Sequence, residues 1–449
     1  MYFCSPKQRA KTMLLNTEIR VKGFVASRYN VLCSTENCIL ILYNLLYNHL
    51  VELDNEDLAV IEHGAIDPET EIGQLLVEMK YVIPESANEL DYYKFHYNRS
   101  HFDQSALSLS ILTTLACNLS CPYCYENKNG VTMNVTTANQ VKDWVVNNLD
   151  GKRILSVNWF GGEPLLNMKS IVMLSEAFIA HCSTSHIDYQ AGITTNGCLL
   201  TPEVVETLEK CKVYNVQVTF DGSKDFHNKM KHFSNGEGSY NRIVENIVNY
   251  CTNSKSHLPL RIRVNLSDEN YESIETLLND LPDVVKEHSS IFFRWIYSTE
   301  TSGWKEFSEK KAGSSPYKGI FSLIKMAHEK GYHVENRCET VDFRFCEADN
   351  PGYYTIDPLG NIYLCVHDYK PEVSVGHVRD GIHQSKEPQY LAFRNVSVLD
   401  DNECLQCKVL PICNGGCKKF RLEGKKQCIF EKDNLDLYVE NIYHRNTIV

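Results

Sequence analysis

The stretch Thr114-Leu-Ala-Cys117-Asn-Leu-Ser-Cys121-Pro-Tyr-Cys124-Tyr-Glu126 decides how the rest of the chain is interpreted. It follows an alternating, strand-like run at 107–112 and places three thiols close together in a CxxxCxxC pattern. Three thiolates are one fewer than a closed tetrahedral or cubane site requires, so a metal centre held here keeps an open coordination position. The stretch therefore predicts a catalytic metal or iron–sulfur site, while zinc also fits the pattern when it is read alone.

Length and charge limit the alternatives. The 449 residues exceed what one hydrophobic core usually supports, so two or three structural units are expected. A net charge of −12 opposes non-specific binding to nucleic acid and to anionic membranes, and neither is expected as a partner. The N-terminus offers no signal-peptide pattern, and no apolar run is long enough to span a bilayer. A cytoplasmic protein with reduced cysteines is expected.

The chain has 18 cysteines, which separate by spacing into isolated and clustered ones. Seven are isolated and are expected to be core residues: Cys4, Cys33, Cys38, Cys182, Cys198, Cys211 and Cys251. Eight more form a C-terminal group: Cys338, Cys346, Cys365, Cys404, Cys407, Cys413, Cys417 and Cys428. Eight thiols suffice for two further metal sites, although the Cys404-x₂-Cys407 pair alone favours zinc.

Between the two groups, strand-like and helical patterns alternate. Strands are expected near 107–112, 154–160, 189–194, 213–220, 260–264 and 291–296, and helices near 136–149, 168–182, 202–209, 240–250 and 271–285. This order predicts an α/β fold with a parallel sheet, curved or closed, whose active residues follow the C-terminal strand ends. The segments after the second, third and fourth strands are Gly161-Gly162-Glu163-Pro164, Thr195-Asn196-Gly197 and Asp221-Gly222.

Together, the cysteine run, Gly-Gly-Glu-Pro and Thr-Asn-Gly in this order resemble the radical S-adenosylmethionine (SAM) superfamily. The C-terminal cysteines and Gly360 resemble the seven-cysteine motif of its SPASM extension. The resemblance covers roughly residues 105–435. It implies a partial (β/α)₆ TIM-like barrel at 105–315, a Cys-rich SPASM lobe with two auxiliary clusters at 316–435, and a tail at 436–449. With all these motifs present, zinc becomes the minor interpretation.

The resemblance also implies roles for single residues around the first site. Cys117, Cys121 and Cys124 would hold a [4Fe–4S] cluster whose open iron binds SAM. The remaining cofactor contacts divide by the part of SAM that they face. Gly161, Gly162 and Glu163 would hold its ammonium, Thr195 and Asn196 would face the ribose, and Tyr123 would lie near adenine. Lys231 stands where relatives carry an arginine for the carboxylate, so Arg263 is a second candidate.

Two auxiliary [4Fe–4S] clusters follow from the SPASM resemblance, which makes three clusters in all. The inner cluster would use Cys346, Cys365 and Cys417, with Cys338 as the fourth ligand and a buried thiol as the alternative for that residue. The outer cluster would use Cys404, Cys407, Cys413 and Cys428. A flavodoxin- or ferredoxin-type reductant is the expected electron donor.

Residues 19–90 differ in pattern from the barrel and suit a small winged-helix unit. This is similar to the N-terminal element with which many radical SAM peptide maturases bind a leader peptide as an added strand. A packing lobe without peptide affinity is the alternative. Residues 1–18 are polar, which is typical of a partly disordered segment, and 91–104 is expected to be a linker.

SPASM-bearing relatives mostly modify peptides or proteins. Sulfatase-maturating relatives carry an aspartate base directly after the cysteine that corresponds to Cys365, where this chain has Val366. The nearest ionisable residues, His367 and Asp368, are the candidate bases, and exposed polar residues are the alternative. The expected function is hydrogen abstraction from a ribosomal precursor peptide that leads to an intramolecular thioether, C–C or ether cross-link. Formylglycine formation on a sulfatase and a zinc-binding interaction module are the alternatives.

Overall fold

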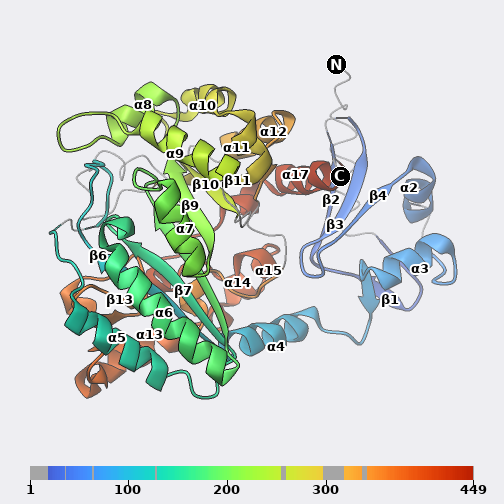
Figure 1. Ribbon diagram of the computed structural model, residues 1–449. Helices are drawn as coiled ribbons and strands as arrows, with labels where there is room; N and C mark the ends of the chain where they lie inside the picture. Colours follow the sequence, from blue (N-terminus) through green and yellow to red (C-terminus); the bar gives the residue numbers. More distant parts are fainter. Residues whose placement is uncertain are drawn as a thin grey trace. The chain divides into compact units, whose positions relative to one another are not determined.

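The computed structural model describes residues 19–35, 37–62, 65–126, 129–253, 259–296, 318–335 and 341–447 (Figure 1). The chain forms two compact units, each made of segments that are separated in sequence. The first unit contains the described parts of Met1–Phe102, Arg337–Asp349 and Asn395–Val449, and the second those of Asp103–Asn336 and Asn350–Arg394. Residues 1–18, Cys4 and Cys338 lie outside the described residues, so the predictions made for them stay open.

A mostly parallel sheet of eleven strands forms the second unit. Its centre consists of six parallel strands that lie side by side in sequence order, and all six strands expected from the sequence form. They are β6 (Ala106–Thr114), β7 (Ile154–Gly161), β8 (Asp188–Thr195), β9 (Val213–Phe220), β10 (Leu260–Leu266) and β11 (Ser289–Trp295). Because neighbouring parallel strands share one direction, their C-terminal ends meet at one edge, which confirms the predicted α/β arrangement.

Both sides of this sheet continue beyond the expected strands. β12 (His333–Val334) pairs in parallel with β11. On the other side, β13 (Tyr353–Ile356) pairs in parallel with β6, and three antiparallel strands follow it. These are β14 (Asn361–Tyr363), β15 (Gly376–His377) and β16 (Gly381–Ile382). Strands this short contain too few residues to show alternation, so their hydrophobic pattern could not predict them.

Helices connect the parallel strands. They are α5 (Val135–Asn147), α6 (Met168–Ser185), α7 (Pro202–Lys210), α8 (Lys224–Met230), α9 (Tyr240–Asn253), α10 (Ile274–Asp280), α11 (Asp283–His288) and α12 (Lys318–Glu329), with α13 (Glu387–Asn395) after β16. The single helix expected at 271–285 is wrong. A short turn at Tyr271–Ser273 precedes α10, and the chain breaks at Leu281, whose ψ is 128°. The cause is Pro282, which lacks an N–H and disfavours helical geometry in the residue before it.

One helical stretch in the described part of the chain, Pro164–Ser185, has the length and apolar composition that a membrane span requires. It includes α6, whose Ile171, Leu174 and Phe178 side chains are fully buried. The helix packs against α5 and β8. Its apolar character is therefore accounted for by the protein core, as the sequence pattern predicts.

The first unit begins with a three-stranded antiparallel sheet of β2 (Asn30–Ser34), β3 (Leu40–Asn44) and β4 (His49–Leu53). Strands β1 (Phe24–Ala26) and β5 (Val82–Pro84) pair separately, and α2 (Asn55–Glu62) and α3 (Glu71–Glu78) lie between β4 and β5 in sequence. Leu32, Leu42, Leu76 and Tyr81 are buried in one core. This short N-terminal β region with two helices agrees with the expected small unit.

Helical structure also occupies two stretches expected to be connections. α4 (Glu89–His101) covers most of the segment expected to be a linker, and α17 (Leu435–Thr447) covers most of the expected tail. α17 packs on β2 and β3, with the Tyr438 and Tyr43 rings edge to face at 6.3 Å. Short helices lie among the C-terminal cysteines: α14 (Asn402–Leu405) contains Cys404, α15 (Leu410–Cys413) ends at Cys413, and α16 (Lys418–Leu422) follows Cys417.

Candidate functional site

The loop that carries Cys117, Cys121 and Cys124 follows β6 and contacts the end of β7. The Gly162 and Glu163 N–H groups donate to the Thr114 and Ala116 carbonyl oxygens at 3.0 and 2.9 Å. A Cβ at Gly161, whose φ is +124°, would lie 2.2 Å from the Thr114 oxygen, and one at Gly162 would lie 2.3 Å from the Ala116 oxygen. Both glycines are therefore needed for the two backbones to approach. From the sequence, a ligand is expected to approach these two glycines closely. In the structure, the backbone of β6 and of the loop after it lies against them.

Glu163 lies at the centre of this strand edge and is fully buried. Its carboxylate accepts hydrogen bonds from the Thr195 hydroxyl at 2.7 Å, the Asn196 N–H at 2.8 Å and the Leu165 N–H at 3.1 Å. Burial raises the pKa of Glu163, and these donors and the Lys231 charge act in the opposite direction. A carboxylate offers about four acceptor positions, and these three donors occupy most of them.

Asn196 connects the third strand end to the cysteine loop. Its Nδ2 donates to Asn118 Oδ1 at 2.7 Å and lies 3.9 Å from Cys117 Sγ, and its Oδ1 accepts from the Cys198 N–H at 2.9 Å. Because Thr195 and Asn196 both contact Glu163, the predicted ammonium and ribose residues form one group beside Cys117.

Tyr123 and Asp221 join the cysteine loop to the fourth strand end. The Tyr123 hydroxyl donates to the Asp221 carboxylate, whose oxygens lie 2.9 and 2.8 Å away. Asn265, on β10, donates to Asp221 Oδ1 at 2.9 Å and to the Tyr123 oxygen at 3.2 Å. Burial raises the pKa of Asp221 and of Tyr123. The sequence places Asp221 at a strand end and predicts no role for Asn265. Asp221 directly follows β9 and Asn265 lies within β10, and this position was the only indication that the sequence contained.

The two cations proposed for the carboxylate of SAM face the same group. Lys231 is 5% exposed and donates from Nζ to the Thr219 carbonyl at 3.0 Å, and its charge lowers the pKa of Glu163 and Asp221 against the effect of burial. Arg263 donates from Nε to Asn265 Oδ1 at 2.9 Å. Burial lowers the pKa of Arg263. The structure thus brings both cations to this strand edge, and their assignment to SAM stays a prediction.

The two candidate bases follow β14. The His367 ring lies edge to face with Tyr125, which directly follows Cys124, at a centroid distance of 4.9 Å. The Asp368 N–H donates to the Cys365 carbonyl at 3.2 Å. Burial raises the pKa of the neighbouring Tyr369, and the charges of Glu126 and Cys124 add to this. The segment with the candidate bases is therefore adjacent to the cysteine loop within the second unit.

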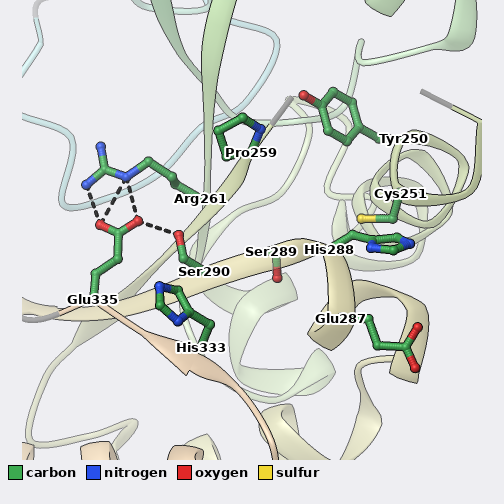
Figure 2. Close-up of a pocket in the computed structure, with 10 residues that line it drawn as sticks. All are labelled: Tyr250, Cys251, Pro259, Arg261, Glu287, His288, Ser289, Ser290, His333 and Glu335. Carbon is green, nitrogen blue, oxygen red and sulfur yellow. Dashed lines mark hydrogen bonds and ion pairs between the residues drawn. The ribbon is translucent and has the colours of Figure 1, made fainter. Parts of the chain in front are cut away.

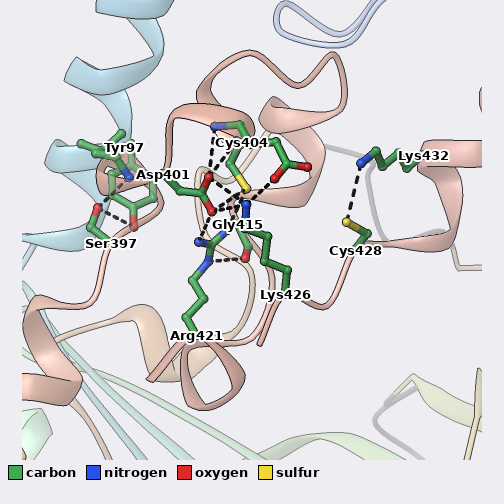
Figure 3. Close-up of polar contacts among 11 residues, drawn as sticks. Tyr97, Ser397, Asp401, Cys404, Gly415, Arg421, Lys426, Cys428 and Lys432 are labelled. Carbon is green, nitrogen blue, oxygen red and sulfur yellow. Dashed lines mark hydrogen bonds and ion pairs between the residues drawn. The ribbon is translucent and has the colours of Figure 1, made fainter. Parts of the chain in front are cut away.

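The four cysteines expected to hold the outer cluster belong to the first unit, and Figure 3 shows two of them, Cys404 and Cys428, with their polar contacts. Arg421 Nη2 donates to Cys404 Sγ at 3.0 Å, and Lys432 Nζ lies 3.8 Å from Cys428 Sγ. Burial raises the pKa of Cys413, and the charges of Cys428 and Cys404 raise it further. Cys407 and Cys428 together raise the pKa of Lys432. The charges of Cys404 and Cys428 thus act on Cys413, and the outer ligand set stays a prediction.

The inner set is only partly assembled within one unit. The Cys346 N–H donates to Asp349 Oδ2 at 3.2 Å, and Asp349 Oδ1 lies 3.8 Å from Nζ of Lys418, the residue after Cys417. Asp349 thus links the surroundings of two expected ligands. Cys365 belongs to the second unit, and Cys338 lies outside the described residues. The inner ligand set stays a prediction.

The prediction that the isolated cysteines lie in the core is confirmed for four of the six described ones, whereas Cys38 and Cys251 are half-buried. Cys33, Cys182, Cys198 and Cys211 are buried, and burial raises the pKa of Cys33 and Cys198 to about 12. Each described candidate ligand is half-buried or exposed, and no described cysteine forms a disulfide. Within the described residues, no three His, Cys, Asp or Glu side chains already stand in a metal-binding group. The donor set consists of partly accessible thiols in loops and short helices, and cysteine thiolates are the ligands that iron–sulfur clusters take.

A separate cavity of about 610 Å³ lies at the other ends of the strands (Figure 2). Residues at the starts of β10, β11 and β12 line it, among them Pro259, Ser289 and His333. Arg261 Nε donates to both carboxylate oxygens of Glu335 at 2.8 and 3.0 Å, and the Ser290 hydroxyl donates to the same carboxylate. The residues predicted for SAM and the cluster are absent from its described lining.

Comparisons with known proteins agree with this site. Residues 111–281 match the family model described as Radical SAM superfamily. The radical SAM cyclopropyl synthase TigE of Paramaledivibacter caminithermalis is 22% identical over 425 residues, covering 86% of this chain and 84% of that protein. A cysteine-type anaerobic sulfatase-maturating enzyme of Clostridium novyi is 21% identical, covering 70% of this chain and 88% of that protein. The solved structure of native anSMEcpe with bound AdoMet and Cp18Cys peptide has a TM-score of 0.57 at 16% identity, covering 76% and 100% of the two chains, and this similarity shows a shared fold.

Proposed function

We propose that this chain, which belongs to the radical SAM superfamily and has SPASM-type relatives, installs an intramolecular cross-link in a ribosomal precursor peptide. The observation that carries the proposal is the convergence of three strand ends on the cysteine loop. Glu163 contacts Thr195 and Asn196, Asn196 contacts Asn118, and Tyr123 contacts Asp221. This strand edge unites the acids, amides and thiols that a SAM-binding cluster site requires.

The chain is a radical SAM enzyme, and a [4Fe–4S] cluster and SAM are the cofactors of that superfamily. Cys117, Cys121 and Cys124 would hold the cluster. When bound, the cluster and SAM together supply one-electron cleavage of SAM and a radical that abstracts hydrogen. Glu163 would accept a hydrogen bond from the SAM ammonium, and Lys231 or Arg263 would pair with its carboxylate.

Two features support a peptide as the substrate. The solved structure of anSMEcpe, which shares the fold of this chain, holds a bound peptide. In this chain, β4 is an edge strand of the N-terminal antiparallel sheet, while α17 packs on β2 and β3. We propose that a leader peptide pairs with β4, because an edge strand presents unpaired backbone groups for strand addition.

Cross-link formation removes two hydrogens from the substrate. One leaves as a hydrogen atom, and the other leaves as a proton and an electron. His367 and Asp368 are the proposed proton acceptors because their segment lies beside Tyr125, next to the cysteine loop. We propose that two auxiliary clusters, held by the C-terminal cysteines, accept the electron that leaves the substrate. A flavodoxin- or ferredoxin-type protein is the proposed reductant of the enzyme, and the proposed location is the cytoplasm.

Co-expression with a short open reading frame encoded beside the gene, followed by mass spectrometry, tests the proposal. The expected product is the peptide lacking two hydrogens, with fragmentation suppressed between the joined residues. A variant in which Cys117, Cys121 and Cys124 are changed to Ala is the control and should leave the peptide unmodified. The proposal is wrong if the purified enzyme modifies no small peptide and instead oxidises one Cys or Ser of a folded sulfatase.

That second outcome would support formylglycine formation, which the similarity to sulfatase-maturating enzymes favours. The presence of Val366 in place of the aspartate base argues against it. Iron and sulfide analysis of anaerobically purified protein separates both enzymes from a zinc-binding module. Three filled cubanes correspond to about twelve irons per chain, whereas zinc without iron would contradict both enzymatic functions.

A further inference from the structure

The Arg421 side chain is held by three groups around the C-terminal cysteines (Figure 3). Its Nη2 donates to Cys404 Sγ at 3.0 Å, its Nη1 lies 3.2 Å from Asp401 Oδ2, and its Nε donates to the Gly415 carbonyl. The guanidinium therefore joins one thiol to the turn between Cys413 and Cys417. Only 11% of the Arg421 side chain is exposed, so these contacts are largely shielded from water.

The surrounding backbone is shaped for this side chain. Gly415 has a φ of +88°, and a Cβ placed on it would lie 2.9 Å from Arg421 Nη2 and 2.6 Å from the Val398 Cβ. Glycine at this position permits the close approach of the turn to the guanidinium. The Arg421 N–H also donates to the Cys417 carbonyl at 3.1 Å. The position of Arg421 is thus fixed by the contacts of its guanidinium group and by the hydrogen bond of its main-chain N–H.

The position of Asp401 explains why a cation is required here. Asp401 Oδ2 accepts a hydrogen bond from the Cys404 thiol at 3.4 Å. A cysteine that ligates a metal has lost this proton, so the carboxylate and the sulfur would then face each other as two negative groups. Arg421 contacts both, and Lys426 adds a second cation 3.0 Å from Asp401. Of these two cations, Arg421 is the one placed to donate to the sulfur.

We propose that Arg421 is a positioning residue that hydrogen-bonds the ligating sulfur of Cys404 and thereby raises the reduction potential of the outer auxiliary cluster. Hydrogen bonds to cluster sulfurs and nearby positive charge stabilise the reduced, more negative state. The inference rests on the proposed function, because it requires that Cys404, Cys407, Cys413 and Cys428 hold a cluster.

The test uses the full chain with Cys117, Cys121 and Cys124 changed to Ala, so that the auxiliary clusters alone contribute. Midpoint potentials are measured by redox titration monitored by electron paramagnetic resonance, with iron content measured in parallel. Arg421→Met removes the hydrogen bond and the charge, and Arg421→Lys keeps the charge without the planar fork. Lys425→Met is the matched control, since Lys425 is 67% exposed and pairs with Glu423.

The outer cluster of Arg421→Met should show a more negative potential, Arg421→Lys a smaller negative shift, and Lys425→Met none. An unchanged potential in Arg421→Met with full iron content would overturn the inference. If Arg421→Met loses the iron of the outer cluster, the test rests on Arg421→Lys. A midpoint potential of Arg421→Lys equal to that of the parent chain would then overturn the inference. A parent chain without about eight irons would instead refute the auxiliary clusters of the proposed function.

Discussion

A hydrogen bond between the side chains of Tyr123 and Asp221 joins the cysteine loop to the end of β9. Tyr123 lies between two expected cluster ligands, and its hydroxyl meets Asp221, 98 positions further along the chain. Asp221 is 1% exposed, and its carboxylate accepts from Tyr123 and Asn265. A buried carboxylate is stable only while such donors remain. The contact therefore fixes the cysteine loop to the end of β9.

Changing Tyr123 to Phe should lower the free energy of unfolding by about 1–3 kcal/mol, because Asp221 loses a donor while it stays buried. The measurement is urea unfolding of the cluster-free protein. Iron content after reconstitution should also fall at the first site. Tyr214→Phe is the control, since Tyr214 is 49% exposed on β9. Equal unfolding free energies for Tyr123→Phe and the unmodified chain would contradict this role.

Motif and spacing gave the residues that follow each strand, and the structure brings Glu163, Thr195 and Asn196 together as that logic predicts. Their partners could not be predicted. Asn265 reaches Asp221 because β10 lies beside β9, and only the strand register places these two side chains opposite each other. The sequence predicts that a ligand approaches Gly161 and Gly162 closely, whereas the backbone that approaches them in the structure is that of β6 and the loop after it.

At the scale of elements, long periodic segments were predictable and short or interrupted ones were not. The six core strands form because each has enough residues to show a pattern. The pattern at 271–285 stayed helical across Pro282, although that proline divides the segment into α10 and α11. At one edge of the sheet, β12 consists of His333–Val334 alone, so few backbone hydrogen bonds join it to β11. Side-chain contacts near β12 can therefore add to its stability.

The Arg261–Glu335 ion pair makes such a contribution, since it connects β10 to the residue after β12. Burial raises the pKa of Glu335, but hydrogen bonds from Arg261 and Ser290 outweigh it and leave the pKa below its ordinary value of 4.5. A lowered folded-state pKa means that the pair stabilises the fold above pH 4.5 and that this stabilisation is lost as the pH falls through the lowered value.

Glu335→Gln should therefore lower the free energy of unfolding by about 0.5–1 kcal/mol at neutral pH, a modest effect because both side chains are partly exposed. The difference should shrink as the pH falls below 4.5. Chemical unfolding at several pH values measures it, with Glu287→Gln as the control, since Glu287 is an exposed acid lining the same cavity. A loss of equal size at acidic and neutral pH would show that charge pairing is not the cause.

At the scale of the whole molecule, the two compact units combine segments that are distant in sequence. Residues 395–447 belong with the N-terminal sheet, and β13 to β16 extend the parallel sheet. Cysteine spacing correctly predicts the burial of Cys33, Cys182, Cys198 and Cys211, but it fails for Cys38 and Cys251, which are half-buried. It cannot show that Arg421 meets Cys404, since this contact depends on how loops fold around Gly415.

The proposed function requires that the loop after β6 carries the SAM-cleaving cluster and that the C-terminal cysteines hold separate clusters. The most direct test is anaerobic reconstitution of the full chain and of the Cys117→Ala, Cys121→Ala, Cys124→Ala triple variant, followed by incubation with SAM and a reductant. The unmodified chain should contain about twelve irons and produce 5′-deoxyadenosine, and the variant should keep about eight irons and produce none. Continued 5′-deoxyadenosine formation by the triple variant would contradict the account.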